Sequence, residues 1–151
     1  MPIPPNVTLS SLREFSRFSF LKARLEEETA ERFVRDLRIR TPSLRQKVAR
    51  LSGGNQQKVV LSKWMCRESK IMLFDEPTRG IDVAAKAEVF QLMSGLAQQG
   101  IGVLMISSEL PELLGMCDRI LVMRKGTFVA EFQASCTTQE QLLKMASGIG
   151  G

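Results

Sequence analysis

The sequence predicts an α/β fold in which a parallel β-sheet is covered by helices on both faces. Three observations support this prediction. Residues 71–74 and 101–106 are continuous apolar runs of strand length. Residues 84–98, between them, indicate a helix. Neither run alternates apolar with polar residues, and such strands are typical of parallel sheets that are buried on both faces.

Composition excludes several classes of protein. The chain has 151 residues, of which 44% are hydrophobic and 25% are charged, which is ordinary for one folded domain. It contains no histidine, and this excludes Ser-His-Asp and Cys-His catalysis and HExxH zinc sites. Any catalysis would therefore depend on carboxylates, lysine, backbone dipoles or a bound metal ion.

Localisation is indicated by the same inventory. The three cysteines, Cys66, Cys117 and Cys136, are odd in number and widely spaced, which indicates reduced thiols in a cytosolic protein. The first residues do not resemble a secretion signal. No apolar run approaches the roughly 18 residues that a membrane-spanning helix needs. We therefore expect a chain that does not cross a membrane.

The first third of the chain is predicted to be helical. Apolar residues recur at helical spacing over residues 23–39, which predicts an amphipathic helix that is stopped by Thr41-Pro42. Residues 9–20 are expected to form a second helix. The composition changes after Leu51, so we expect a partial helical subdomain over residues 1–50 and an α/β lobe over residues 51–151.

Positive charge is concentrated in this first third. Residues 1–50 carry 11 Lys and Arg against 6 Asp and Glu, whereas residues 51–151 carry 10 of each. A basic lobe could contact nucleic acid, a lipid surface or an acidic partner, or it could be a solvated helix face.

The rest of the chain is predicted to continue as short elements. Apolar residues from Val59 to Met65 indicate a helix, and residues 109–114 indicate another. A β-hairpin is expected from residues 119–123 and 127–132 around Arg124-Lys125-Gly126. Thr137 and Glu140 form a capping box, which predicts a final helix through Met145.

A glycine pair opens the helix that contains Val59. The sequence there is Leu51-Ser52-Gly53-Gly54-Asn55-Gln56-Gln57-Lys58. Two glycines let the backbone approach a ligand closely, and the free N–H groups and the dipole at a helix start favour an anion. The Ser52 hydroxyl adds a donor. A plain turn is the alternative.

Two carboxylates follow the strand over residues 71–74. Ligands of open α/β sheets bind at the carboxyl ends of strands. Asp75 can hold a hydrated Mg²⁺ there, and Glu76 can orient a water for attack on a phosphoryl group. The alternative is a solvated Asp-Glu-Pro turn. Asp82, after Gly80, could cap the next helix.

The order and spacing of these motifs resemble the ATP-binding subunits of ABC transporters. Residues 51–57 resemble the family signature, residues 71–76 the Walker B strand and residues 80–82 the D-loop. Asn55, residues 75–82 and residues 106–120 resemble the second nucleotide-binding domain of fused importers for ribose, galactose and related sugars. The resemblance runs from about Val7 to the C-terminus. It implies a partial P-loop NTPase-like ABC nucleotide-binding domain.

The resemblance also implies cofactors and residue roles. The cofactors are ATP and Mg²⁺, with Asp75 as the metal ligand and Glu76 as the catalytic carboxylate. The implied nucleotide-binding residues are Ser52, Gly53, Gly54, Asn55, Gln56, Asp82 and Ser108. Two domains of this family sandwich ATP head to tail. The signature would therefore cap ATP held by a second nucleotide-binding domain, while Asp75 and Glu76 would serve the site on their own side.

Two features depart from the family pattern. No glycine is followed by lysine, so the sequence contains no Walker A motif. We therefore expect the C-terminal portion of a nucleotide-binding domain, beginning inside its helical subdomain and hydrolysing no ATP alone. Ser108 occupies the usual position of the switch histidine, and this serine is typical of the second domain of sugar-type importers.

The implied partners are transmembrane permease subunits and, indirectly, a periplasmic sugar-binding protein. The implied location is peripheral, at the cytoplasmic face of the inner membrane, and no nucleic acid is expected. One alternative is a soluble ABC protein acting on nucleic acid or the ribosome. Such relatives carry Asn-His-Leu-Asp where this chain has Arg79-Gly80-Ile81-Asp82. Another alternative is an inert remnant, or half of a split domain that needs a separate Walker A half.

Overall fold

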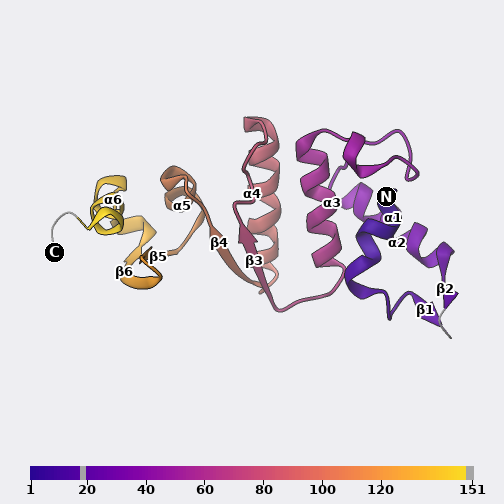
Figure 1. The fold of residues 1–151 in the computed structure, drawn as a ribbon, viewed down its shortest axis with the longest axis horizontal. Helices are drawn as coiled ribbons and strands as arrows, with labels where there is room; N and C mark the ends of the chain where they lie inside the picture. Colours follow the sequence, from indigo (N-terminus) through magenta and orange to yellow (C-terminus); the bar gives the residue numbers. More distant parts are fainter. Residues whose placement is uncertain (18–19, 149–151) are drawn as a thin grey trace. The chain divides into compact units, whose positions relative to one another are not determined.

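The fold is seen in a computed structural model, which describes residues 1–17 and 20–148 (Figure 1). The chain divides into two compact units. Unit 1 comprises residues 1–72 and 78–103, and unit 2 comprises residues 73–77 and the chain from residue 104 onward. The predicted division at residue 51 was drawn from composition, and it stays a prediction.

Unit 1 contains most of the helices. It begins with α1 (Ile3–Thr8), the 3-10 turn η1 (Leu9–Ser11) and an antiparallel pair, β1 (Ser16–Arg17) and β2 (Phe20–Leu21). Next come α2 (Ala23–Asp36) and the 3-10 turn η2 (Val48–Arg50). The helices α3 (Gly53–Met65) and α4 (Val83–Gln98) complete it, and α1 packs against both α2 and α3.

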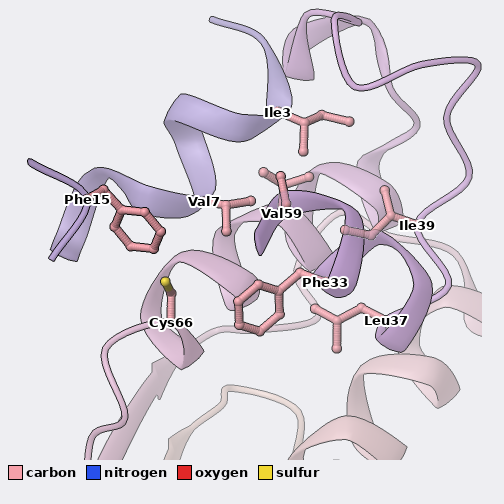
Figure 2. Packing of buried hydrophobic residues seen from close by; sticks show 9 residues of the cluster. Ile3, Val7, Phe15, Phe33, Leu37, Ile39, Val59 and Cys66 are labelled. Atoms are coloured by element: carbon pink, nitrogen blue, oxygen red, sulfur yellow. The ribbon is translucent and has the colours of Figure 1, made fainter. Parts of the chain in front are cut away.

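The core of unit 1 lies between α1, α2 and α3 (Figure 2). Ile3 and Val7, one helical turn apart on α1, point toward Val59 of α3. Phe33 of α2 closes the cluster, which also contains Phe15, Ala30, Leu37, Ile39 and Cys66. Burial raises the pKa of the Cys66 thiol above its ordinary value, and Glu14 adds to the effect. The apolar burial accounts for the stability of these short helices.

The predicted helix over residues 9–20 is wrong at residues 9–17 and 20, and residues 18–19 lie outside the described part of the chain. The N-terminal helix lies earlier, at Ile3–Thr8, and the chain then turns into β1 and β2. Pro4 stands in the first turn of α1. The N–H groups of a first turn have no partner within the helix, so proline, which lacks an N–H, is well suited to start a helix here. Burial of Ile3 and Val7 then stabilises that helix, whereas Leu12, Arg13 and Glu14 beyond Ser11 are exposed.

The amphipathic helix is confirmed, but it ends earlier than expected. α2 stops at Asp36, and Arg38 has a left-handed φ of 50°. A left-handed residue just past a helix is a common way for a helix to end. The turn at Arg38 therefore ends α2 before the chain reaches Thr41-Pro42.

The two predicted strands are β3 (Ile71–Asp75) and β4 (Gly102–Ile106), and they pair with each other. The N–H of Gly102 donates to the carbonyl of Lys70 at 2.9 Å, and the N–H of Glu76 donates to the carbonyl of Ile106 at 2.9 Å. The residue numbers rise together along both strands, so the pair is parallel. The predicted α/β class is confirmed.

Burial of β3 differs from the prediction. Met72 and Phe74 are buried, but Ile71 and Leu73 are 65% and 68% exposed. Successive side chains of a strand point to opposite faces, so one face of β3 is covered in this chain and the other is open. A continuous apolar run cannot by itself show whether its second face is covered.

Unit 2 contains α5 (Leu110–Met116), β5 (Arg119–Arg124), β6 (Thr127–Gln133), the 3-10 turn η3 (Ala134–Cys136) and α6 (Gln139–Ser147). β5 and β6 form the predicted hairpin, with Lys125 and Gly126 at positive φ in its turn. The buried core of unit 2 contains Ile120, Val122, Ala134 and Leu142.

The capping box of α6 lies one residue beyond the predicted Thr137 and Glu140. Thr138 Oγ1 accepts from the N–H of Gln141 at 3.3 Å, and Gln141 Oε1 accepts from the N–H of Thr138 at 3.0 Å. Glutamine serves this position as well as glutamate. Two adjacent threonines allow both registers in the sequence, and Leu142 is buried in the register that the structure adopts.

Two phenylalanines in unit 1 test the assignment of its core. Phe33 is 6% exposed and Phe20 is 80% exposed. We expect Phe33→Ala to lower the free energy of unfolding by about 3–5 kcal/mol, because it leaves a cavity. Phe20→Ala should change it by less than about 0.5 kcal/mol. Urea unfolding followed by circular dichroism measures both, and equal effects would contradict the assignment.

Candidate functional site

The glycine pair stands at the start of α3, where Ser52 is the N-cap residue. The Ser52 side chain makes no capping bond to the helix. Its Oγ instead accepts from Asn55 Nδ2 at 2.8 Å, and Asn55 Oδ1 accepts from the N–H of Arg40 at 2.8 Å. The hydroxyl of Ser52 therefore retains its own hydrogen for another acceptor. The Ser52 side chain therefore leaves the first N–H groups of α3 without a capping bond, and free N–H groups at a helix start can bind an anion.

Gln56 has a supporting position in this turn. Its Nε2 donates to the carbonyl of Leu51 at 2.8 Å. This bond links the residue before Ser52 to the first turn of α3. The Gln56 side chain therefore stabilises the turn that contains Ser52.

The segment from Gly80 to Asp82 lies against the start of α3. A Cβ on Gly53 would lie 3.5 Å from Ile81 Cγ2, and a Cβ on Gly54 would lie 2.6 Å from Ala85 Cβ. The second distance is too short for two carbon atoms, so the approach of α4 requires glycine at position 54. Gly80 has φ of 76°, which favours glycine as well.

Asp82 caps α4, as the sequence allowed. Its Oδ1 accepts from the N–H of Ala85 at 2.9 Å. This bond satisfies a donor in the first turn of α4 and fixes where that helix begins. Asp82 thereby sets the position of the segment that faces Gly53.

One turn farther along both helices, Lys58 meets Glu88. Lys58 Nζ lies 2.6 Å from Glu88 Oε2 and donates to the carbonyl of Arg38 at 3.3 Å. Lys58 is 3% exposed, whereas the Glu88 side chain is 43% exposed. The hydrogen bond from Lys58 lowers the pKa of Glu88 below its ordinary value. A buried ammonium needs such a partner, so this ion pair joins α3 to α4.

Sequence reasoning missed the role of Lys58. The available signal was its spacing, because Lys58 is four residues after Gly54 and so lies on the same face of α3. That face could be recognised as the one that meets α4 only after the close approach at Gly54 was known.

The second group of predicted residues lies in unit 2. Asp75 is exposed at the carboxyl end of β3, and Glu76 follows it with a left-handed φ of 46°. Glu76 Oε1 accepts from the N–H of Ser108 at 2.9 Å. The structure thus brings Glu76 and Ser108 together through the main-chain amide of Ser108. The Ser108 hydroxyl takes no part in this bond, and the nucleotide-binding role that the sequence predicts for Ser108 stays a prediction.

The carboxylates fit one mode of Mg²⁺ binding. Over residues 1–17 and 20–148, no group of three or more Cys, Asp and Glu side chains could hold a metal ion by itself. Mg²⁺ commonly takes one or two carboxylates and completes its shell with water and substrate phosphates. Asp75 is exposed and suits that mode.

The predicted site residues therefore fall into two groups. Unit 1 holds Ser52, Gly53, Gly54, Asn55, Gln56 and Asp82, and unit 2 holds Asp75, Glu76 and Ser108.

None of the helices in the described part of the chain combines the length and apolar character of a membrane span.

Comparison with known sequences supports a family assignment. The profile of the family described as ABC transporter matches residues 5–79. A ribose/galactose/methyl galactoside import ATP-binding protein of Burkholderia cenocepacia is 55% identical over 149 residues. A xylose import ATP-binding protein of Geobacillus kaustophilus is 48% identical over 148 residues. Each alignment covers 98% of this chain but 29% of the relative, so the chain spans less than a third of the length of these relatives.

Solved structures share the fold at low sequence identity. An inward-facing metal-chelate type ABC transporter superposes with a TM-score of 0.83 at 21% identity, covering 98% of this chain and 58% of that one. A dimeric ATP-binding cassette in a post-hydrolysis state, bound to ADP and Pi, gives 0.72 at 20% identity, covering 89% and 57%.

The two adjacent glycines of α3 allow a matched test of the close approach. We expect Gly54→Ala to lower the free energy of unfolding by about 1–3 kcal/mol, because the added carbon overlaps Ala85. Gly53→Ala meets Ile81 at an ordinary contact distance and should change it by less than about 0.5 kcal/mol. Urea unfolding measures both. Equal tolerance at the two positions would contradict this packing.

The ion pair of Lys58 and Glu88 predicts a pH dependence of stability. The pKa of Glu88 is lowered in the folded chain, so its stabilising effect is complete above its ordinary pKa and is lost as the pH falls through the lowered value. We expect Glu88→Gln to be less stable than the wild type at pH 7, by an amount that shrinks toward zero in acid. Urea unfolding from pH 7 to pH 3 measures this difference, and a constant difference would argue against the ion pair.

Proposed function

Because the chain belongs to the family of ABC transporter ATP-binding subunits, we propose that it forms part of the ATP-binding component of a sugar importer. In that component it would supply the signature motif to an ATP sandwich. The observation that carries this proposal is the start of α3, where Ser52 makes no capping bond to the helix. Uncapped N–H groups and a hydroxyl at a helix start suit a phosphate.

The residues of unit 1 would contact the phosphates of ATP. The N–H groups of Gly53, Gly54 and Asn55 belong to the first turn of α3, and the Ser52 hydroxyl retains its hydrogen. Hydrogen bonds from such donors to a phosphate are charge-assisted and stronger than neutral ones. Gln56 and Asp82 would support this surface through the bonds they make within the chain.

The residues of unit 2 would serve the chemistry. Asp75 would hold Mg²⁺, which neutralises phosphate charge when it is bound. Glu76 would orient the attacking water and accept its proton, as a carboxylate can when it is held in place. The main-chain N–H of Ser108 donates to the carboxylate of Glu76, so this hydrogen bond does not require the Ser108 hydroxyl.

Partners follow from the same proposal. The sequence contains no Walker A motif, so the ATP capped by Ser52 would be held by a second nucleotide-binding domain. Ile71 and Leu73 of β3 are exposed, and an apolar strand face is normally covered. This exposure favours the packing of a further protein segment against that strand. Permease subunits and a periplasmic sugar-binding protein would complete the importer at the cytoplasmic face of the inner membrane. The named relatives point to ribose, galactose or xylose as the class of solute.

A chimera tests this function. In the Burkholderia cenocepacia relative, this chain would replace the 149 residues that it matches. We expect the chimera to hydrolyse ATP and the chain alone to release phosphate at background. Glu76→Gln in the chimera should lower the turnover number about 10²- to 10⁴-fold, because it removes the proton acceptor. Ser52→Ala should lower it by about tenfold, through loss of a charge-assisted hydrogen bond.

Ser135→Ala is the matched control, since Ser135 is an exposed serine outside the motifs. It should leave the turnover number unchanged. A chimera whose turnover is insensitive to Glu76→Gln and Ser52→Ala would argue against the proposal. Steady ATP hydrolysis by the chain alone, abolished by Glu76→Gln, would argue against its dependence on a second domain.

A further inference from the structure

Glu76 is held at two points by one short segment at the end of β4. Its N–H donates to the carbonyl of Ile106 at 2.9 Å, and its Oε1 accepts from the N–H of Ser108 at 2.9 Å. The left-handed φ of Glu76 is disfavoured for a residue with a side chain, and such a conformation persists where the surroundings determine it. The first of these hydrogen bonds holds the main chain of Glu76 in this conformation, and the second holds its side chain.

The group that meets Glu76 is a main-chain amide. Every residue except proline carries a main-chain N–H, so the hydroxyl of Ser108 is not needed for the contact. The direction of this amide depends on the path of residues 107–109. What fixes that path therefore orients the carboxylate of Glu76.

The hydroxyl of Ser107 fixes the path on both sides of Ser108. Its Oγ accepts from the N–H of Glu109 at 3.0 Å and donates to Glu112 Oε2 at 3.0 Å. Glu112 is buried and lies in the first turn of α5. The Ser107 hydroxyl thus accepts from the N–H of Glu109 within the segment, and its hydrogen joins the segment to Glu112 of α5. Residue 108 lies between the two residues, Ser107 and Glu109, that this network holds.

We propose that Ser107 is a positioning residue, which orients the carboxylate of Glu76 by fixing the amide of residue 108. The assignment of a catalytic role to that carboxylate rests on the proposed function. The hydrogen-bond network does not, and it can be measured in the full chain without nucleotide. A failed test of Ser107 and a failed test of ATP hydrolysis are therefore distinguishable.

Amide hydrogen exchange of residue 108, followed by NMR spectroscopy, tests the proposal. Glu76→Ala removes the acceptor and sets the exchange rate of the amide without its hydrogen bond. We expect Ser107→Ala to move the exchange rate roughly tenfold toward that reference, as loss of one such bond predicts. Ser107→Thr retains a hydroxyl and should restore the slow exchange. Ser108→Ala is the matched control and should exchange as slowly as the wild type.

Two results would overturn the proposal. One is slow exchange at residue 108 in Ser107→Ala, and the other is fast exchange in Ser108→Ala equal to that in Glu76→Ala. Circular dichroism shows whether each variant folds. If Ser107→Ala does not fold, Glu112→Gln decides, because it weakens the same bond from its other end. It should accelerate exchange at residue 108 in the same direction by a smaller factor, and an unchanged rate would count against Ser107.

Discussion

The close approach of α3 and α4 is the constraint on which the site in unit 1 depends. A Cβ on Gly54 would overlap Ala85, so glycine at position 54 is a condition of the packing. One turn farther on, the buried Lys58 makes its ion pair with Glu88 and adds a hydrogen bond to the carbonyl of Arg38. The start of α3 and the segment capped by Asp82 are consequently held as one surface. A glycine pair that resembles a flexible turn in sequence is, in the structure, a tightly packed helix start.

The site in unit 2 depends on a different kind of constraint. Asp75 and Glu76 stand at the carboxyl end of β3, which is where parallel strands place ligand-binding residues. Glu76 adopts a left-handed conformation and bonds to residues 106 and 108. The side chain that would carry the chemistry is therefore placed by main-chain groups of the neighbouring strand end. This explains how serine at position 108 is compatible with an ordered Glu76.

The sequence was informative where local chemistry decides the structure. The strands at residues 71–75 and 102–106, the helices α3 and α4, the hairpin and the cap at Asp82 follow from apolar runs, turn residues and capping residues. The predicted helix over residues 9–20 failed because burial of Ile3 and Val7 selected an earlier helix. The roles of Lys58, Ser107 and the amide of Ser108 could not be predicted, since each depends on a partner brought close by tertiary packing. The candidate residues were thus found from motifs, but the contacts that hold them were not.

We propose that the start of α3 binds a triphosphate held by another domain. The most direct measurement follows the NMR amide resonances of Gly53, Gly54 and Asn55 while an intact, hydrolysis-blocked ATP-binding cassette is added with and without ATP. We expect shifts of these amides with the ATP-loaded cassette, and none with ATP alone or with the empty cassette. If the ATP-loaded cassette bound the chain and left these three amides unshifted, the claim would be contradicted.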